Sequence, residues 1–187
     1  MLPGDPQPLS KKDLTEHFVS GERVFSGRLL QVHRDTVRLP DGSTGTREYI
    51  RHPGAVLALP LFDDGSVLLE RQYRYPNARD FLELPAGKRE PGEAPLETAK
   101  RELLEETGYV AREWTVLGVV HTTVAFTDEA IDLFLARGLE FRGARLDEGE
   151  FLETLLVPFA EALKMVRDGR ITDSKTVVAL LYCKAFV

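Results

Sequence analysis

The sequence predicts an α+β fold, with helices packed on the faces of a mixed β-sheet. Strand-like segments recur along most of the chain, whereas helical periodicity occurs once in mid-chain and twice near the C-terminus. The 187 residues suffice for one domain with a small appendage. Hydrophobic residues make up 43% of the chain and charged residues 29%, which excludes the disordered, fibrous and membrane-embedded classes.

Three segments are expected along the chain. Residues 1–20 are expected to be a mobile N-terminal segment, because Pro, Gly and charged residues are frequent there and leave little to bury. Residues 21–52 are expected to form an N-terminal antiparallel strand region, in which Val and Thr alternate with charges around a turn at residues 41–43. Residues 53–187 are expected to form the main domain.

The main domain begins with two apolar segments, AVLALPLF and SVLLERQYRY, joined by the turn signal Asp63-Asp64-Gly65. We expect these segments to be two strands. Further strand-like runs occur at WTVLGVVHTTV, IDLFLARGL and FLETLLVP. Two helical patterns end the chain, PFAEALKMVRDG and a last one that Asp173 or Ser174 could cap.

The mid-chain helix is expected from Glu93 to Thr107. Leu96, Ala99 and Leu103 recur there at helical spacing, and Gly108 suits a left-handed C-cap.

Charge and cysteine content narrow the class of partner. Thirty acidic against 24 basic residues give a net charge of −6, which opposes a phosphate backbone, so we expect no nucleic-acid polymer as a partner. The single Cys183 excludes an internal disulfide framework and a multi-cysteine zinc site. The sequence has neither a signal-peptide pattern nor about 18 consecutive apolar residues, so we expect a cytoplasmic protein that contacts no membrane.

Three glutamates form the strongest chemical signal. Glu102, Glu105 and Glu106 stand at i, i+3 and i+4, so their carboxylates project from one face of the mid-chain helix. Each like-charge pair at this spacing costs about 0.2 to 0.5 kcal/mol, and the last turn also faces the negative end of the helix dipole. A divalent cation would offset these penalties, and Mg²⁺ or Mn²⁺ suits such hard oxygen ligands. The alternative is an ordinary solvated acidic face.

The segment around these glutamates resembles the signature of the Nudix hydrolases. That signature is a glycine, five residues, a glutamate, seven residues, Arg-Glu, an aliphatic residue, any residue, Glu-Glu, any residue, a glycine and an aliphatic residue. The chain matches it with Gly87, Glu93, Arg101, Glu102, Leu103, Glu105, Glu106 and Gly108. Tyr109 departs from it, as an aromatic where Ile, Leu or Val is usual.

This resemblance implies a mixed β-sheet sandwiched between helices, and a loop-helix-loop that binds Mg²⁺ or Mn²⁺. The implied reaction is hydrolysis of a nucleoside diphosphate linked to another group. By the same analogy the metal ligands are the carboxylates of Glu102, Glu105 and Glu106 and the main-chain carbonyl of Ala86. Gly87, Glu93, Arg101 and Gly108 are implied to shape the loop and the helix.

A looser similarity extends over residues 20–187 toward the ADP-ribose pyrophosphatase branch of that family. It is carried by ERQYRYP, the E-x-P-A-G lead-in, the FTDE and FLAR runs and a late acidic loop. It implies ADP-ribose or a similar sugar nucleotide as substrate and a homodimer formed through the N-terminal strand region. Val124 stands where the branch usually has a proline, so other substrates such as GDP-mannose stay open.

The branch also implies substrate-binding residues and a base. Arg74 is implied to clamp a phosphate, with a plain surface arginine as the alternative. Arg47, Glu48 and Arg51 are implied to help bind the nucleotide and Tyr49 to stack on adenine, although an exposed strand face and aromatic packing explain them equally. In the acidic loop Glu150 aligns best with the general base and Glu148 second. His121, at the end of an apolar strand, is expected to be structural.

We therefore expect an enzyme that cleaves the pyrophosphate of ADP-ribose or a related nucleoside diphosphate sugar to a nucleoside monophosphate and a sugar phosphate. The alternatives are a hydrolase of GDP-mannose, NADH or a nucleoside triphosphate, and a non-catalytic nucleotide-sensing module. The sensing module is disfavoured because the box retains its glutamates and its arginine.

Overall fold

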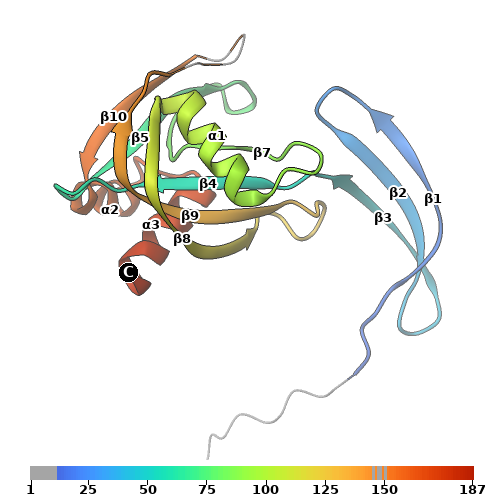
Figure 1. Cartoon of the computed structure of the whole chain (residues 1–187). Helices are drawn as coiled ribbons and strands as arrows, with labels where there is room; N and C mark the ends of the chain where they lie inside the picture. Colours follow the sequence, from blue (N-terminus) through green and yellow to red (C-terminus); the bar gives the residue numbers. More distant parts are fainter. Residues whose placement is uncertain (1–11, 145, 147–148, 150) are drawn as a thin grey trace, which may run out of the picture. The chain divides into compact units, whose positions relative to one another are not determined.

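The computed structural model describes residues 12–144, Leu146, Gly149 and residues 151–187. The chain forms two compact units, Met1–Arg51 and His52–Val187 (Figure 1).

The first unit contains a three-stranded antiparallel sheet in the order β1-β2-β3. Its strands are β1 (His17–Ser26), β2 (Gln31–Arg38) and β3 (Thr44–Arg51). β1 starts earlier than residue 21, where the sequence placed the beginning of the strand region. The sequence gives no sign of this because β1 pairs with β2 through its main chain while all of its side chains are exposed.

The second unit contains two sheets. The four-stranded sheet has the order β7-β4-β9-β8 and consists of β7 (Ala86–Lys88), β4 (Ala55–Pro60), β9 (Ala130–Phe141) and β8 (Tyr109–His121). β4 and β9 are parallel and the other pairs are antiparallel, so the predicted mixed sheet is confirmed. The three-stranded antiparallel sheet has the order β10-β5-β6 and consists of β10 (Leu152–Pro158), β5 (Ser66–Arg74) and β6 (Arg79–Glu83).

The helices of the second unit are a 3₁₀ turn η1 (Tyr75–Asn77), α1 (Pro95–Thr107), α2 (Phe159–Arg167) and α3 (Ser174–Phe186). α1 begins at Pro95, so the predicted start at Glu93 is wrong. Proline suits the first helical position but holds the preceding residue in an extended conformation, and Ala94 accordingly has φ −72° and ψ 143°. Among the helices of the described residues, none is both long and apolar enough to span a membrane.

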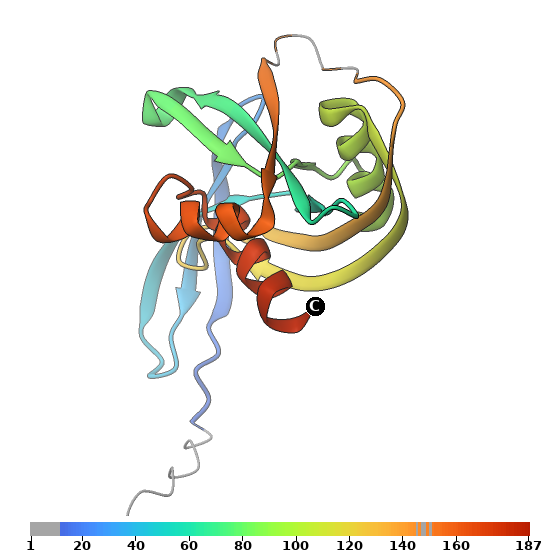
Figure 2. The same ribbon diagram turned by 90° about the vertical axis from the view of Figure 1, so that its left-hand side faces the viewer.

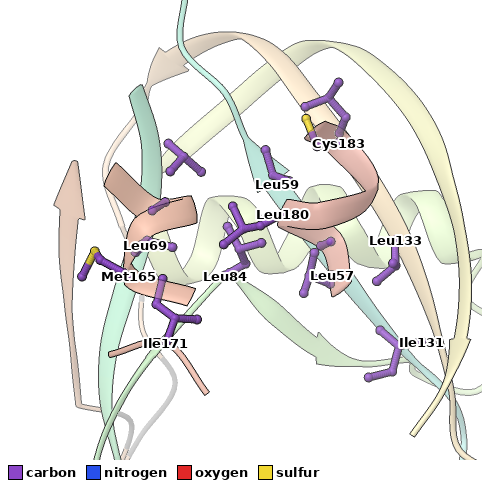
Figure 3. Close-up of a cluster of buried hydrophobic side chains, with 14 of the residues drawn as sticks. Leu57, Leu59, Leu69, Leu84, Ile131, Leu133, Met165, Ile171, Leu180 and Cys183 are labelled. Atoms are coloured by element: carbon purple, nitrogen blue, oxygen red, sulfur yellow. The ribbon is translucent and has the colours of Figure 1, made fainter. Parts of the chain in front are cut away.

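β4 is buried on both faces, and this places the main core around it. Val56 and Ala58 belong to the apolar clusters that contain Ala99 and Leu103 of α1. Leu57 and Leu59 point the other way, into the cluster formed with α2 and α3 (Figure 3). Alternate side chains of β4 therefore pack against helices on opposite faces of the sheet. The sheet is sandwiched between helices, as predicted, and Figure 2 shows α1 apart from the α2 and α3 pair.

Replacing Leu57 with Ala should lower the free energy of unfolding by about 2 to 5 kcal/mol, because Leu57 is 0% exposed and its loss leaves a cavity. Leu156→Ala is the matched control, since Leu156 is 56% exposed and should cost less than about 1 kcal/mol. Urea unfolding of both variants measures the difference, and equal costs would contradict this placement of the core.

Candidate active site

The glutamate-bearing helix α1 ends where the sequence predicted. Gly108 has φ 76°, and its amide donates to the carbonyl of Leu104. A Cβ on Gly108 would lie 2.5 Å from the amide nitrogen of Ala144, so both the left-handed backbone and the close approach of this chain segment require glycine.

Arg101 joins the acidic side chains of this region. Its guanidinium donates to both carboxylate oxygens of Glu93, at 3.0 and 3.1 Å. It also donates to Glu102 Oε1 at 2.9 Å and to Glu105 Oε2 at 3.0 Å. One cation therefore offsets the mutual repulsion of three carboxylates, and it connects the loop before α1 to the acidic face of the helix.

The paired guanidinium also affects protonation. The hydrogen bonds from Arg101 lower the pKa of Glu93 to about 2, and the Thr98 hydroxyl assists by donating to Glu93 Oε2 at 2.8 Å. Glu93 lies before the helix and contacts Arg101 from the loop, which fits the structural role implied for it.

Strand β7, which precedes α1 in the chain, lies directly against Glu102 and Glu106. A Cβ on Gly87 would lie 1.9 Å from the carboxyl carbon of Glu102, so only glycine leaves room for that carboxylate. Glu106 is only 7% exposed, and its Oε2 accepts a hydrogen bond of 3.0 Å from the Ala86 amide. The structure thus brings together Ala86, Gly87, Glu102 and Glu106.

These four residues line one wall of a cavity of about 850 Å³ in the second unit. Glu105 is not among the lining residues, and Arg101 bridges it to Glu102. The cavity also contains Arg74, Lys88, Arg89, Arg101 and Lys175, so cationic side chains face the same space as the two carboxylates. Such a mixture suits an anionic ligand held beside metal-binding carboxylates.

Arg74, which the sequence predicts to clamp a phosphate, lines the cavity and forms an ion pair with Glu83. Its Nε and Nη2 donate to the two oxygens of Glu83, both at 2.7 Å. Lys175 forms a second ion pair with Glu83 and donates to Asp173 Oδ2 at 2.9 Å. Burial alone would raise the pKa of Glu83, but Arg74 and Lys175 outweigh it and lower the pKa.

Sequence reasoning missed Asp173 and Lys175 as lining residues of the cavity, and it missed Glu83 as the carboxylate that pairs with Arg74. Glu83 belongs to the E-x-P-A-G lead-in, and the sequence indicates Asp173 only as a candidate helix cap. Asp173 does cap α3, because its side chain accepts from the Thr176 amide at 3.1 Å. The signal that could have found Lys175 is a basic residue two positions after that cap.

A second missed group lies on another part of the cavity wall. His52 Nε2 lies 3.5 Å from Glu129 Oε1, and the Thr122 hydroxyl donates to Glu129 Oε2 at 2.5 Å. The Gly54 amide donates to His52 Nδ1 at 3.2 Å, which leaves Nε2 to carry the proton toward Glu129. His121 is exposed at the end of β8 and does not line the cavity, and neither does Val124.

The predicted nucleotide-binding residues of β3 lie in the first unit, each with a partner there. Arg47 pairs with Glu16, and the Tyr49 hydroxyl donates to Asp35 Oδ2 at 2.8 Å. Arg51 lies over the Tyr49 ring at 5.0 Å, and Glu48 is opposite Arg34 in the sheet. The predicted bases Glu148 and Glu150 lie outside the described residues.

The oxygen atoms near Ala86 that could act as metal ligands suit a hard divalent cation. Carboxylate oxygens and a main-chain carbonyl are the ligands that Mg²⁺ and Mn²⁺ prefer, and the missing Cβ of Gly87 lets a carboxylate approach the loop. Within the described part of the chain, no three His, Cys, Asp or Glu side chains form a group that could hold a metal ion.

The fold and this loop-helix site define an enzyme of the Nudix hydrolase class. The NUDIX domain model matches residues 51–180, and the model of the nucleoside diphosphate sugar hydrolase N-terminal domain matches residues 16–50. The chain belongs to the Nudix family.

Three known proteins illustrate the similarity. The chain is 40% identical over 173 residues to the ADP-ribose pyrophosphatase of Bacillus subtilis, covering 91% of this chain and 94% of that protein. It is 42% identical over 169 residues to the methanol dehydrogenase activator of Bacillus methanolicus, covering 89% and 91%. A crystal structure of an ADP compounds hydrolase superposes with a TM-score of 0.84 at 26% identity, covering 92% of this chain and 95% of the other.

The Glu93–Arg101 pair predicts a pH dependence of stability. Because folding lowers the pKa of Glu93 from 4.5 to about 2, its ionised form contributes stability above pH 4.5, and that contribution is lost as the pH falls toward 2. Glu93→Gln should therefore cost about 1 kcal/mol or more at pH 7 and distinctly less at pH 3.

Urea unfolding at both pH values measures this effect. Glu97→Gln is the matched control, since Glu97 is exposed and pairs with Lys100 on the surface of the same helix. A cost of Glu93→Gln that is the same at pH 7 and pH 3 would refute the contribution of this ion pair.

Proposed function

We propose that this enzyme hydrolyses the pyrophosphate bond of ADP-ribose or a related nucleoside diphosphate sugar, with Mg²⁺ or Mn²⁺ as cofactor. The products would be a nucleoside monophosphate and a sugar phosphate. The observation that carries the proposal is the common wall formed by Ala86, Gly87, Glu102 and Glu106 in a cavity that also contains Arg74. The similarity to an ADP-ribose pyrophosphatase over nearly the whole of both chains supports the choice of substrate.

The cation would be held by the carboxylates of Glu102, Glu105 and Glu106 and the carbonyl of Ala86. When bound, it neutralises the charge of the diphosphate and activates water for attack on phosphorus. The chain's own contribution is to keep these ligands in place. Arg101 orients Glu102 and Glu105, and the Ala86 amide fixes the Glu106 carboxylate.

Arg74 would bind a phosphate of the substrate. Its two hydrogen bonds to Glu83 orient the guanidinium plane at the cavity wall, so it need not lose further side-chain freedom when substrate arrives. Glu83 is itself only 4% exposed, which limits the movement of this pair.

The general base is proposed to be Glu150, with Glu148 as second choice, by resemblance to the branch. Arg47, Glu48, Tyr49 and Arg51 are proposed to contact the nucleotide. A homodimer formed through the N-terminal strand region and a cytoplasmic location complete the proposal, together with independence from nucleic acids and membranes.

A substrate panel tests the proposal directly. Purified protein is incubated with ADP-ribose, GDP-mannose, UDP-glucose, NADH and dATP, each with Mg²⁺ or Mn²⁺, and the products are separated by chromatography. AMP and ribose phosphate from ADP-ribose, at the highest kcat/KM of the panel, are the expected result. Preference for another compound would replace the substrate, and no turnover of any compound would favour a nucleotide-sensing module.

Replacing Glu106 with Gln should lower kcat by about a hundredfold or more, because a ligand carboxylate is lost while the side-chain shape is kept. The matched control is Glu97→Gln on the exposed side of α1, which should leave kcat within about twofold of the unchanged enzyme. Near-normal turnover of the Glu106 variant would show that this carboxylate binds no essential ion.

Glu150→Gln should lower kcat more than it raises KM, because a general base acts in the transition state rather than in binding. Glu148→Gln is measured beside it. If only the Glu148 variant loses turnover, the base is Glu148, and if neither loses turnover, the acidic loop supplies no base.

A further inference from the structure

The chain between β6 and β7 is held by several elements at once. Residues 83–86, which we call the strap, end in Ala86 at the proposed metal site. The second half of the strap is held by β4 and α1. The Ala58 amide donates to the Pro85 carbonyl at 2.9 Å, and the Ala86 amide donates to Glu106 at 3.0 Å.

The first half of the strap is held by α3, far away in sequence. The Leu84 amide donates to the hydroxyl of Thr176 at 2.9 Å, and Thr176 is completely buried. The Thr176 amide is in turn capped by Asp173. The Leu84 side chain lies in the same buried cluster as Leu180 of α3 (Figure 3). α3 therefore holds both the main chain of Leu84, through its first turn, and the side chain of Leu84, through Leu180.

Glu83 begins the strap and connects it to Arg74. Its buried carboxylate accepts both hydrogen bonds from Arg74, and Lys175 of the same first turn of α3 pairs with it from another side. Lys175 also pairs with Asp173. Two cations and two carboxylates are thus joined in one charge-balanced network, of which Arg74, Asp173 and Lys175 line the cavity.

Stability alone gives a poor account of this network. Buried ion pairs lose much of their attraction to desolvation, and apolar residues of similar volume often stabilise a fold equally well or better. Holding a guanidinium in one orientation at a cavity wall is a use that apolar residues could not serve.

We propose that Lys175 and Thr176 are positioning residues for the reaction. Thr176 sets the strap that presents the Ala86 carbonyl, and Lys175 sets Glu83, which orients Arg74. The inference rests on the proposed function, in which Ala86 binds the cation and Arg74 binds a phosphate. It adds that the first turn of the C-terminal helix controls the position of both groups.

The Thr176 part is tested with Thr176→Val, which keeps the side-chain shape and removes the hydroxyl. We expect the Kd for Mn²⁺, followed by the electron paramagnetic resonance signal of the free ion, to rise about tenfold and kcat to fall about tenfold. Thr176→Ser retains the hydroxyl and should restore both values. Lys184→Met, on the exposed last turn of α3, is the matched control and should change neither.

The Lys175 part is tested with Lys175→Met. We expect KM for ADP-ribose to rise about tenfold with little change in the Kd for Mn²⁺, because Arg74 and not the metal wall is affected. The effect should largely disappear in an Arg74→Ala background, since the two residues act through the same carboxylate. Thermal unfolding of each variant reports how much of any change is loss of folding.

The proposal would be overturned if Thr176→Val and Lys175→Met both gave Kd, kcat and KM values within twofold of the Lys184→Met control. It would also be overturned if Lys175→Met had the same effect on KM with and without Arg74. If Thr176→Val does not fold, Thr176→Ala and Lys175→Met decide the matter by the same readouts. Failure of the proposed function can be told apart from failure of this inference. In the first case the unchanged enzyme would not hydrolyse ADP-ribose, but the Kd for Mn²⁺ of the Thr176 variants could still be compared.

Discussion

The arrangement of the site depends on the ion pairs that the Arg101 guanidinium forms. It holds Glu93 on the loop and Glu102 and Glu105 on α1, three carboxylates that would otherwise repel one another. Glu102 can approach the loop only because residue 87 has no side chain. Charge neutralisation and a missing Cβ together place an acidic surface against a main-chain loop, and a divalent cation requires ligands of this kind.

The loop is fixed from more than one direction. α1 holds it through Glu106, β4 through Ala58, and α3 through Thr176, so β4 and the two helices on its opposite sides together define where Ala86 lies. The buried strand β4 lies between α1 on one side and α2 and α3 on the other, and its side chains pack against these helices and hold them in position. The geometry of the site therefore depends on the packing of the core, so a substitution outside the cavity can change the position of the site residues.

Local patterns in the sequence predicted much of this. The run from Ala55, the helical period of α1 and the cap at Gly108 each follow from nearby residues, and the spacing of the glutamates indicated a candidate metal site. Contacts between distant residues left no such pattern. Lys175 and Glu83 are 92 residues apart, and no periodicity relates them or links His52 to Glu129. The start of β1 was also missed, because its exposed side chains carry no burial signal.

The most direct test of the account is thermal unfolding during a titration with Mn²⁺ at constant ionic strength. A ligand that binds only the folded state raises stability by about 2.7 kcal/mol at one hundred times its Kd. The Tm of the unchanged protein should therefore rise with Mn²⁺, and that of a variant with Gln at positions 102 and 106 should not. A Tm that does not respond to Mn²⁺, even with ADP-ribose present, would contradict the claim that these carboxylates form a metal site.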